Sequence, residues 1–64
     1  MQCRRISTGH FVKLLLVEDD YALATGLAAA LKREHFLVCN AYSGQEALAE
    51  LRSFDPDMVV LDLG

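Results

Sequence analysis

The chain has 64 residues, enough for one small domain, and a domain of this size buries only about 60% of the surface that its unfolded form exposes. Hydrophobic residues make up 53% of the chain, charged residues 23%, and there is a single proline, a composition that excludes intrinsic disorder. The formal net charge of -3, from six basic and nine acidic residues, excludes a broad basic surface for nucleic acid.

The first eleven residues show no clear periodicity, and we expect residues 1–11 to form a flexible N-terminal extension. The basic residues Arg4, Arg5 and His10 cluster there, so a DNA-contacting arm is the less favoured alternative. This segment lacks the apolar core of a signal peptide, and no apolar run in the chain reaches the roughly 18–20 residues of a spanning helix. The sequence therefore predicts a soluble, cytoplasmic protein without a membrane partner.

The first regular element is predicted over residues 12–17, VKLLLV, a nearly continuous apolar run that ends at three acidic residues. Such a run is typical of a strand that is covered on both faces. From Tyr21 the apolar residues recur at helical spacing and the basic residues come late, which predicts a helix with Asp20 as its N-cap.

His35 is the predicted end of that helix. Histidine tolerates the left-handed cap position better than most residues other than glycine. Residues 36–41, FLVCNA, are short, mainly apolar and partly β-branched, and they predict a second strand.

Ser43 and Glu46 have the spacing of a capping box, and the apolar residues that follow them predict a second helix over residues 44–52. Pro56 ends this helical region, because the residue before a proline is pushed out of the right-handed helical conformation. Residues 58–62 then predict a third strand.

The alternation of strand and helix predicts an α/β fold with a parallel sheet and right-handed crossovers. We expect the strand order 2-1-3, numbered along the chain, in which the two helices cover opposite faces of the sheet. This order creates a topological switch between the first and third strands, and open α/β sheets bind ligands outside the carboxyl ends of their strands at such a switch. The candidate site therefore lies where these two strands end.

Three carboxylates are expected at that switch, because Glu18 and Asp19 follow the first strand and Asp62 ends the third. Like charges at close range oppose one another's ionisation, so the cluster favours a bound cation. Oxygen ligands without histidine or cysteine favour Mg²⁺ over a transition metal. A carboxylate beside a metal can accept a phosphoryl group, and Asp62 is the best-placed acceptor. Taken singly, the acids after the first strand are equally well explained as a helix N-cap or a solvated loop, and Asp62 is better explained as a loop residue.

A family resemblance rests on three segments of the chain: residues 14–20 (LLLVEDD), 41–48 (AYSGQEAL) and 55–63 (DPDMVVLDL). In order and spacing these segments resemble the receiver domains of two-component response regulators. The resemblance covers residues 12–64 and implies a partial receiver domain: a flavodoxin-like, doubly wound parallel sheet, truncated to β-α-β-α-β.

The resemblance also implies residue roles in a phosphorelay, in which the chain is not an enzyme and a histidine kinase donates a phosphoryl group to Asp62 with Mg²⁺. Asp19 matches the direct metal ligand, and Glu18 matches a partner that acts largely through water. Gly64 matches the residue whose backbone oxygen ligates the metal. The hydroxyl and lysine with which the family holds the phosphoryl oxygens follow later strands, so we expect an incomplete domain that is poorly active as a 64-residue fragment.

Other functions have weaker support. Residues 58–61 would form an apolar sheet edge, which invites self-association, so a half-receiver that acts as an unphosphorylated binding or dimerisation module is the alternative. A hydrolase of the haloacid dehalogenase type is disfavoured, because Gly64 stands where it needs a second aspartate. No GxGxxG follows the first strand, which argues against dinucleotide binding. Contact with nucleic acid would need an output domain that none of these residues encodes.

Overall fold

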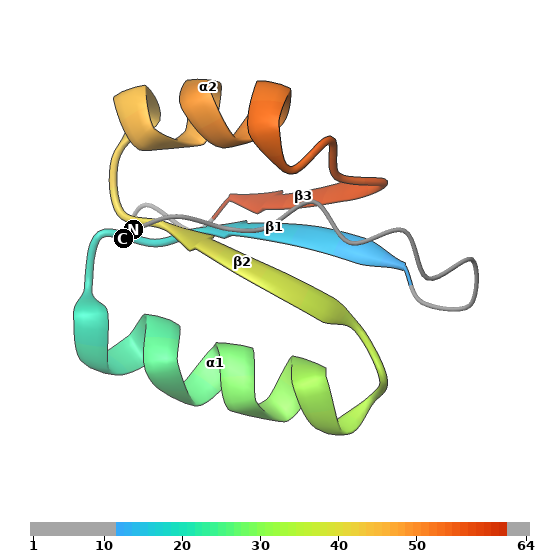
Figure 1. The fold of residues 1–64 in the computed structure, drawn as a ribbon. Helices are drawn as coiled ribbons and strands as arrows, with labels where there is room; N and C mark the ends of the chain where they lie inside the picture. Colours follow the sequence, from blue (N-terminus) through green and yellow to red (C-terminus); the bar gives the residue numbers. More distant parts are fainter. Residues whose placement is uncertain (1–11, 62–64) are drawn as a thin grey trace.

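The computed structural model describes residues 12–61, which form alternating strands and helices (Figure 1). Their bounds, in chain order, are β1 Lys13–Val17, α1 Tyr21–Arg33, β2 Leu37–Ala41, α2 Gly44–Ser53 and β3 Met58–Leu61. Each element agrees with its predicted position to within one or two residues, the usual uncertainty of element ends. The predicted extension over residues 1–11 and the predicted last residue of the third strand, Asp62, lie outside the described residues.

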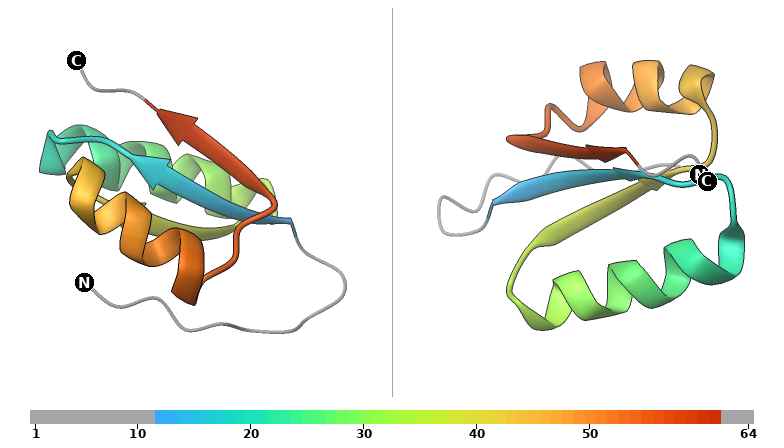
Figure 2. Two further views of the ribbon diagram at one scale, coloured as in Figure 1. Left: turned by 90° about the horizontal axis from the view of Figure 1, so that it is seen from above. Right: turned by 180° about the vertical axis from the view of Figure 1, so that it is seen from behind.

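The three described strands form one parallel sheet in the order β2-β1-β3, which confirms the predicted topology. Val17, the last residue of β1, pairs with Ala41 on one side and with Leu61 on the other, so the carboxyl ends of all three strands lie along one edge. Helices α1 and α2 lie on opposite sides of the sheet, as in a doubly wound fold (Figures 1 and 2).

The predicted helix starts are confirmed by their hydrogen bonds. The Asp20 carboxylate accepts from the backbone N–H of Leu23 at 3.0 Å, and the Ser43 hydroxyl accepts from the backbone N–H of Glu46 at 3.2 Å. The second cap differs from an ideal capping box in one respect. The Glu46 carboxylate reaches back to the N–H of Tyr42, one residue before the cap, at 3.0 Å.

The predicted helix ends are also observed. His35 has a φ of 70°, the left-handed conformation expected after α1. Asp55, directly before Pro56, has a φ of 52°, outside the right-handed helical region. The chain therefore cannot continue α2 through this residue.

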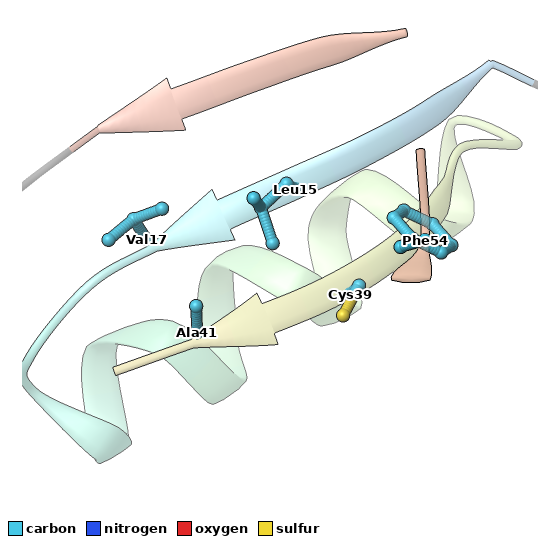
Figure 3. Close-up of a cluster of buried hydrophobic side chains, with 5 residues drawn as sticks. All are labelled: Leu15, Val17, Cys39, Ala41 and Phe54. Carbon is cyan, nitrogen blue, oxygen red and sulfur yellow. The ribbon is translucent and has the colours of Figure 1, made fainter. Parts of the chain in front are cut away.

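Strand β1 is the centre of the core, because both of its faces are covered. On the α2 side, Leu15 and Val17 pack with side chains from β2 and from the end of α2: Cys39, Ala41 and Phe54 (Figure 3). On the α1 side, Leu14 and Leu16 pack with Ala28. Every apolar side chain of β1 is at most 1% exposed, as the continuous apolar run predicts.

Strand β3 has a different environment, although its sequence is as apolar as that of β1. Met58, Val59 and Leu61 are 46%, 43% and 68% exposed, and only Val60 packs against the cluster on the α1 side. Among the described strands, β3 has β1 as its only neighbour.

Neither described helix has the length and apolar character needed to cross a lipid bilayer.

Candidate functional site

The candidate site lies at the edge of the sheet where the parallel strands end and the chain turns into the helices. In Figure 1 the turns that lead from β1 into α1 and from β2 into α2 lie at this same edge. The helices run back from this edge along opposite faces of the sheet, as in a doubly wound fold. The residues directly after β1 are Glu18, Asp19 and Asp20.

Glu18 is the most unusual of these acids because it is almost fully buried, with 1% of its surface exposed. Its backbone N–H donates to the Ala41 carbonyl at 3.0 Å, which extends the pairing of β1 with β2 by one residue. Its side-chain Oε1 accepts from the backbone N–H of Asp20 at 3.0 Å. A carboxylate removed from water is costly unless hydrogen bonds or a cation compensate it, so the position of Glu18 is typical of a site rather than of a solvated loop.

Asp19 and Asp20 are both exposed, but they differ in their role in the fold. Asp20 is the N-cap of α1, with an extended backbone and its carboxylate bonded to the first turn. Asp19 has no capping role and stands between a buried acid and a capping acid. Of the two exposed carboxylates, Asp19 is therefore the one available to a ligand.

The remaining predicted site residues, Asp62 and Gly64, lie outside the described residues. The described sheet ends at Leu61, which pairs with Val17, the residue before Glu18. Glu18 and Asp19 thus lie at the carboxyl edge of the sheet, and the described end of β3 lies beside the residue that precedes them.

The side chains present fit a hard divalent cation. Glu18 and Asp19 offer only carboxylate oxygens, the donors that Mg²⁺ prefers, and one of the two is held rigidly by its hydrogen bond. His35, the one histidine among the described residues, follows α1 at the opposite end of that helix. No three acidic, histidine or cysteine side chains of residues 12–61 form a cluster that could hold a metal by itself.

Two tyrosines at the same edge were not predicted as site residues. Tyr21, which follows Asp20, and Tyr42, which follows β2, stack with their ring centroids 4.1 Å apart and an interplanar angle of 28°. The Tyr42 hydroxyl also accepts from the side-chain amide of Asn40 at 3.2 Å. The rule that pointed to the acids indicates the turns in which both tyrosines lie, after the carboxyl ends of β1 and β2, but it does not predict that their rings stack.

Asp57 shows what an acid does at the opposite edge of the sheet. It precedes β3, its carboxylate accepts from the backbone N–H of Lys13 at 2.9 Å, and its own N–H donates to the Lys13 carbonyl at 2.8 Å. These bonds join the starts of β1 and β3 and use the carboxylate within the fold. The acids at the two edges therefore differ in function, although both adjoin strand ends.

Comparison with known proteins gives a consistent picture. The family model described as the response regulator receiver domain matches residues 14–64. The transcriptional regulatory protein AfsQ1 of Streptomyces coelicolor is 46% identical over 50 residues, which are 78% of this chain and 22% of that protein. The transcriptional regulatory protein TrcR of Mycobacterium tuberculosis is 40% identical over 55 residues, 86% of this chain and 21% of that protein.

A third relative, the alkaline phosphatase synthesis transcriptional regulatory protein PhoP of Bacillus subtilis, is 37% identical over 51 residues, 80% of this chain and 21% of that protein. The chain thus spans about a fifth of the length of these relatives. No solved structure matches it significantly.

Proposed function

Because the chain belongs to the response regulator receiver family, we propose that it acts in a phosphorelay and accepts a phosphoryl group from a histidine kinase on Asp62. The observation that carries the proposal is the register of the sheet: Leu61 pairs with Val17, and the residues that follow these two in the sequence are Asp62 and Glu18. Neighbouring strands are about 4.8 Å apart, a distance over which an acceptor carboxylate and metal ligands can share one site.

The metal in this proposal is Mg²⁺, which when bound supplies the positive charge that an anionic donor and an anionic acceptor both need. Asp19 is the proposed direct ligand, Glu18 acts through a water molecule, and Gly64 contributes its backbone oxygen. The burial of Glu18 supports its role, since a fixed carboxylate orients its neighbour without competing for the open coordination positions.

The test is phosphorylation of the chain with acetyl phosphate and Mg²⁺, followed by intact-mass spectrometry. We expect a gain of about 80 Da that hydroxylamine removes, as for one acyl phosphate. Asp62→Asn abolishes the gain, whereas Asp57→Asn, an acid of the same β3 segment at the opposite edge, retains it. Chelation of Mg²⁺ also abolishes it. Absence of any gain from the folded wild-type chain would overturn the proposal.

The exposed β3 strand favours a second function, that of a self-associating module. β3 has one neighbour among the described strands, and three of its four side chains are substantially exposed. We propose that the 64-residue chain dimerises by pairing of this edge. Analytical ultracentrifugation should show a dimer that Val59→Lys dissociates. A monomer with a sharp thermal transition and well-dispersed amide signals at low concentration would contradict this function.

The names of the three relatives describe transcriptional regulators. For a protein of their length we propose a regulatory role in the cytoplasm, in which phosphorylation of the receiver controls an output on DNA. The proposal assigns no DNA contact to residues of this chain, whose net charge of -3 disfavours one. Replacing the receiver of a reporter regulator with this segment, followed by Asp62→Asn, tests whether the output depends on it.

A further inference from the structure

The stacked pair Tyr21 and Tyr42 lies at the carboxyl edge of the sheet, and the proposed function does not use it. The two rings belong to different crossovers, since Tyr21 begins α1 and Tyr42 lies between β2 and α2. Their contact therefore joins the loop that carries Glu18, Asp19 and Asp20 to the neighbouring loop. Tyr21 is 66% exposed, so the stack does not belong to the hydrophobic core.

Tyr42 is the anchored member of the pair. Its backbone N–H donates to the Glu46 carboxylate at 3.0 Å, and its hydroxyl accepts from Asn40 at 3.2 Å. The bond to Glu46 attaches the backbone of Tyr42 to α2 and fixes the position of the ring on which Tyr21 lies. The Tyr21 ring is held by its stack on Tyr42.

The acidic loop is held firmly on its β2 side. Glu18 donates its N–H to the Ala41 carbonyl, one residue before Tyr42, and the Tyr21 ring adds a second contact three residues further along the loop. Asp19 lies between these two attachments. Because the loop is held at both ends, Asp19 has fewer conformations available before a ligand binds. Binding then costs less conformational entropy.

We propose that the Tyr21–Tyr42 stack is a positioning device that holds the Glu18–Asp20 loop ready for the cation. This inference rests on the proposed function for the identity of the ligand, Mg²⁺. The tyrosines touch neither the cation nor the phosphoryl group, and they act through the backbone of the loop. Loss of one aromatic stacking contact corresponds to about a two- to tenfold change in an equilibrium constant.

The experiment compares three variants of the full chain with the wild type. Tyr42→Ala and Tyr21→Ala each remove the stack from a different side, and Tyr42→Phe keeps the stack but removes the hydroxyl. Leu48→Ala, an exposed apolar truncation on α2, is the matched control. Tyr21→Ala changes an exposed residue, so it keeps the test valid if Tyr42→Ala does not fold.

The first readout is amide hydrogen exchange, which needs no metal. The reporters are the N–H of Glu18, bonded to Ala41, and the N–H of Ala24, bonded to Asp20, each normalised to Ala28 in the middle of α1. We expect both alanine variants to speed the normalised exchange by about two- to tenfold. Tyr42→Phe and Leu48→Ala leave it unchanged.

The second readout is the Mg²⁺ affinity, measured from the amide shifts of Asp19 during a titration. Both alanine variants weaken binding by a similar two- to tenfold factor, and Tyr42→Phe does not. Normalised exchange that stays at the wild-type rate in both alanine variants would overturn the inference, as would an effect of Tyr42→Phe as large as that of Tyr42→Ala. If the wild-type chain binds no Mg²⁺, the proposed function fails, and the exchange rates still decide whether the stack holds the loop.

Discussion

The neighbouring strands β1 and β3 have nearly the same apolar sequence and opposite surroundings. β1 reads KLLLV and β3 reads MVVL, yet the apolar side chains of β1 are at most 1% exposed, while Leu61 of β3 is 68% exposed. The backbones of α1 and α2 both come close to β1 and not to β3, where only Val60 packs against the cluster on the α1 side. The burial of a parallel strand therefore depends on the layers that cover it and not on its own composition.

The same difference extends to the two sides of the candidate site. Glu18, which follows β1, is buried, extends the pairing with β2 and accepts a backbone hydrogen bond. β3, which leads to the proposed acceptor Asp62, is held in the sheet by β1 alone among the described strands. We expect the β1 side of the site to be rigid and the β3 side to depend on additional support.

The largest expected effect comes from truncating one residue of a register pair. Leu15 and Val59 are partners on the same face of the sheet, but Leu15 is fully buried and Val59 is 43% exposed. Leu15→Ala should cost about 2–5 kcal/mol through lost burial and a new cavity. That is comparable to the whole stability of a domain of this size, about 3–10 kcal/mol, so the variant should be largely unfolded. Circular dichroism during urea denaturation measures the change.

Val59→Ala is the matched control, and it should cost about 1 kcal/mol or less because its side chain already contacts water. Equal losses for the two variants would mean that β3 is as well covered in solution as β1. That result would remove the contrast between the strands.

The next effect concerns the start of β3, which Asp57 attaches to β1. Asp57→Ala removes the acceptor of the Lys13 N–H, bonded at 2.9 Å, and should cost about 1–1.5 kcal/mol. Asp57→Asn keeps an acceptor oxygen and should recover most of the loss. If β3 opens by itself, exchange of the Val60 amide will rise more than exchange of the Leu15 amide. Equal rises in both would show that the two strands open together.

A smaller effect is expected at the cap of α2, the helix that covers one face of β1. Ser43→Ala removes the hydroxyl that accepts from the Glu46 N–H and should cost about 1 kcal/mol. Ser43→Asp supplies another capping oxygen and serves as the control. The loss should appear in the denaturation midpoint, and a variant as stable as the wild type would mean that the Glu46 carboxylate caps the helix alone.

Much of the fold could be predicted because local signals and the global topology agree. Asp20, Ser43 and His35 each act through their own backbone neighbourhood, so their roles could be predicted from single positions. The strand order was predicted as that of a doubly wound sheet, in which right-handed crossovers place the two helices on opposite faces. Two features could not be predicted in this way.

The first is the burial of Glu18, because a pattern of residue types does not distinguish a buried carboxylate from one in water. The second is the Tyr21–Tyr42 stack, a contact between residues 21 positions apart that depends on how two loops approach one another. Both are long-range consequences of packing, which a local pattern does not encode.

The smallest expected effect is a stabilisation, and it tests whether β1 and β3 open independently. Gly26 is exposed in the middle of α1, and a Cβ added there would meet no atom within 4 Å. Gly26→Ala should therefore stabilise α1 by about 0.8–1 kcal/mol, since alanine loses less backbone entropy than glycine in a helix. Ala29→Gly, one turn further along the exposed face, should destabilise the chain by a similar amount. Because the backbone of α1 comes close to β1 and not to β3, exchange of the β1 amides should slow about four- to fivefold in Gly26→Ala while exchange of the β3 amides stays the same. Slowing by the same factor in both strands would show that β3 opens only when the whole domain unfolds, and the exposed strand would then be as firmly attached as the buried one.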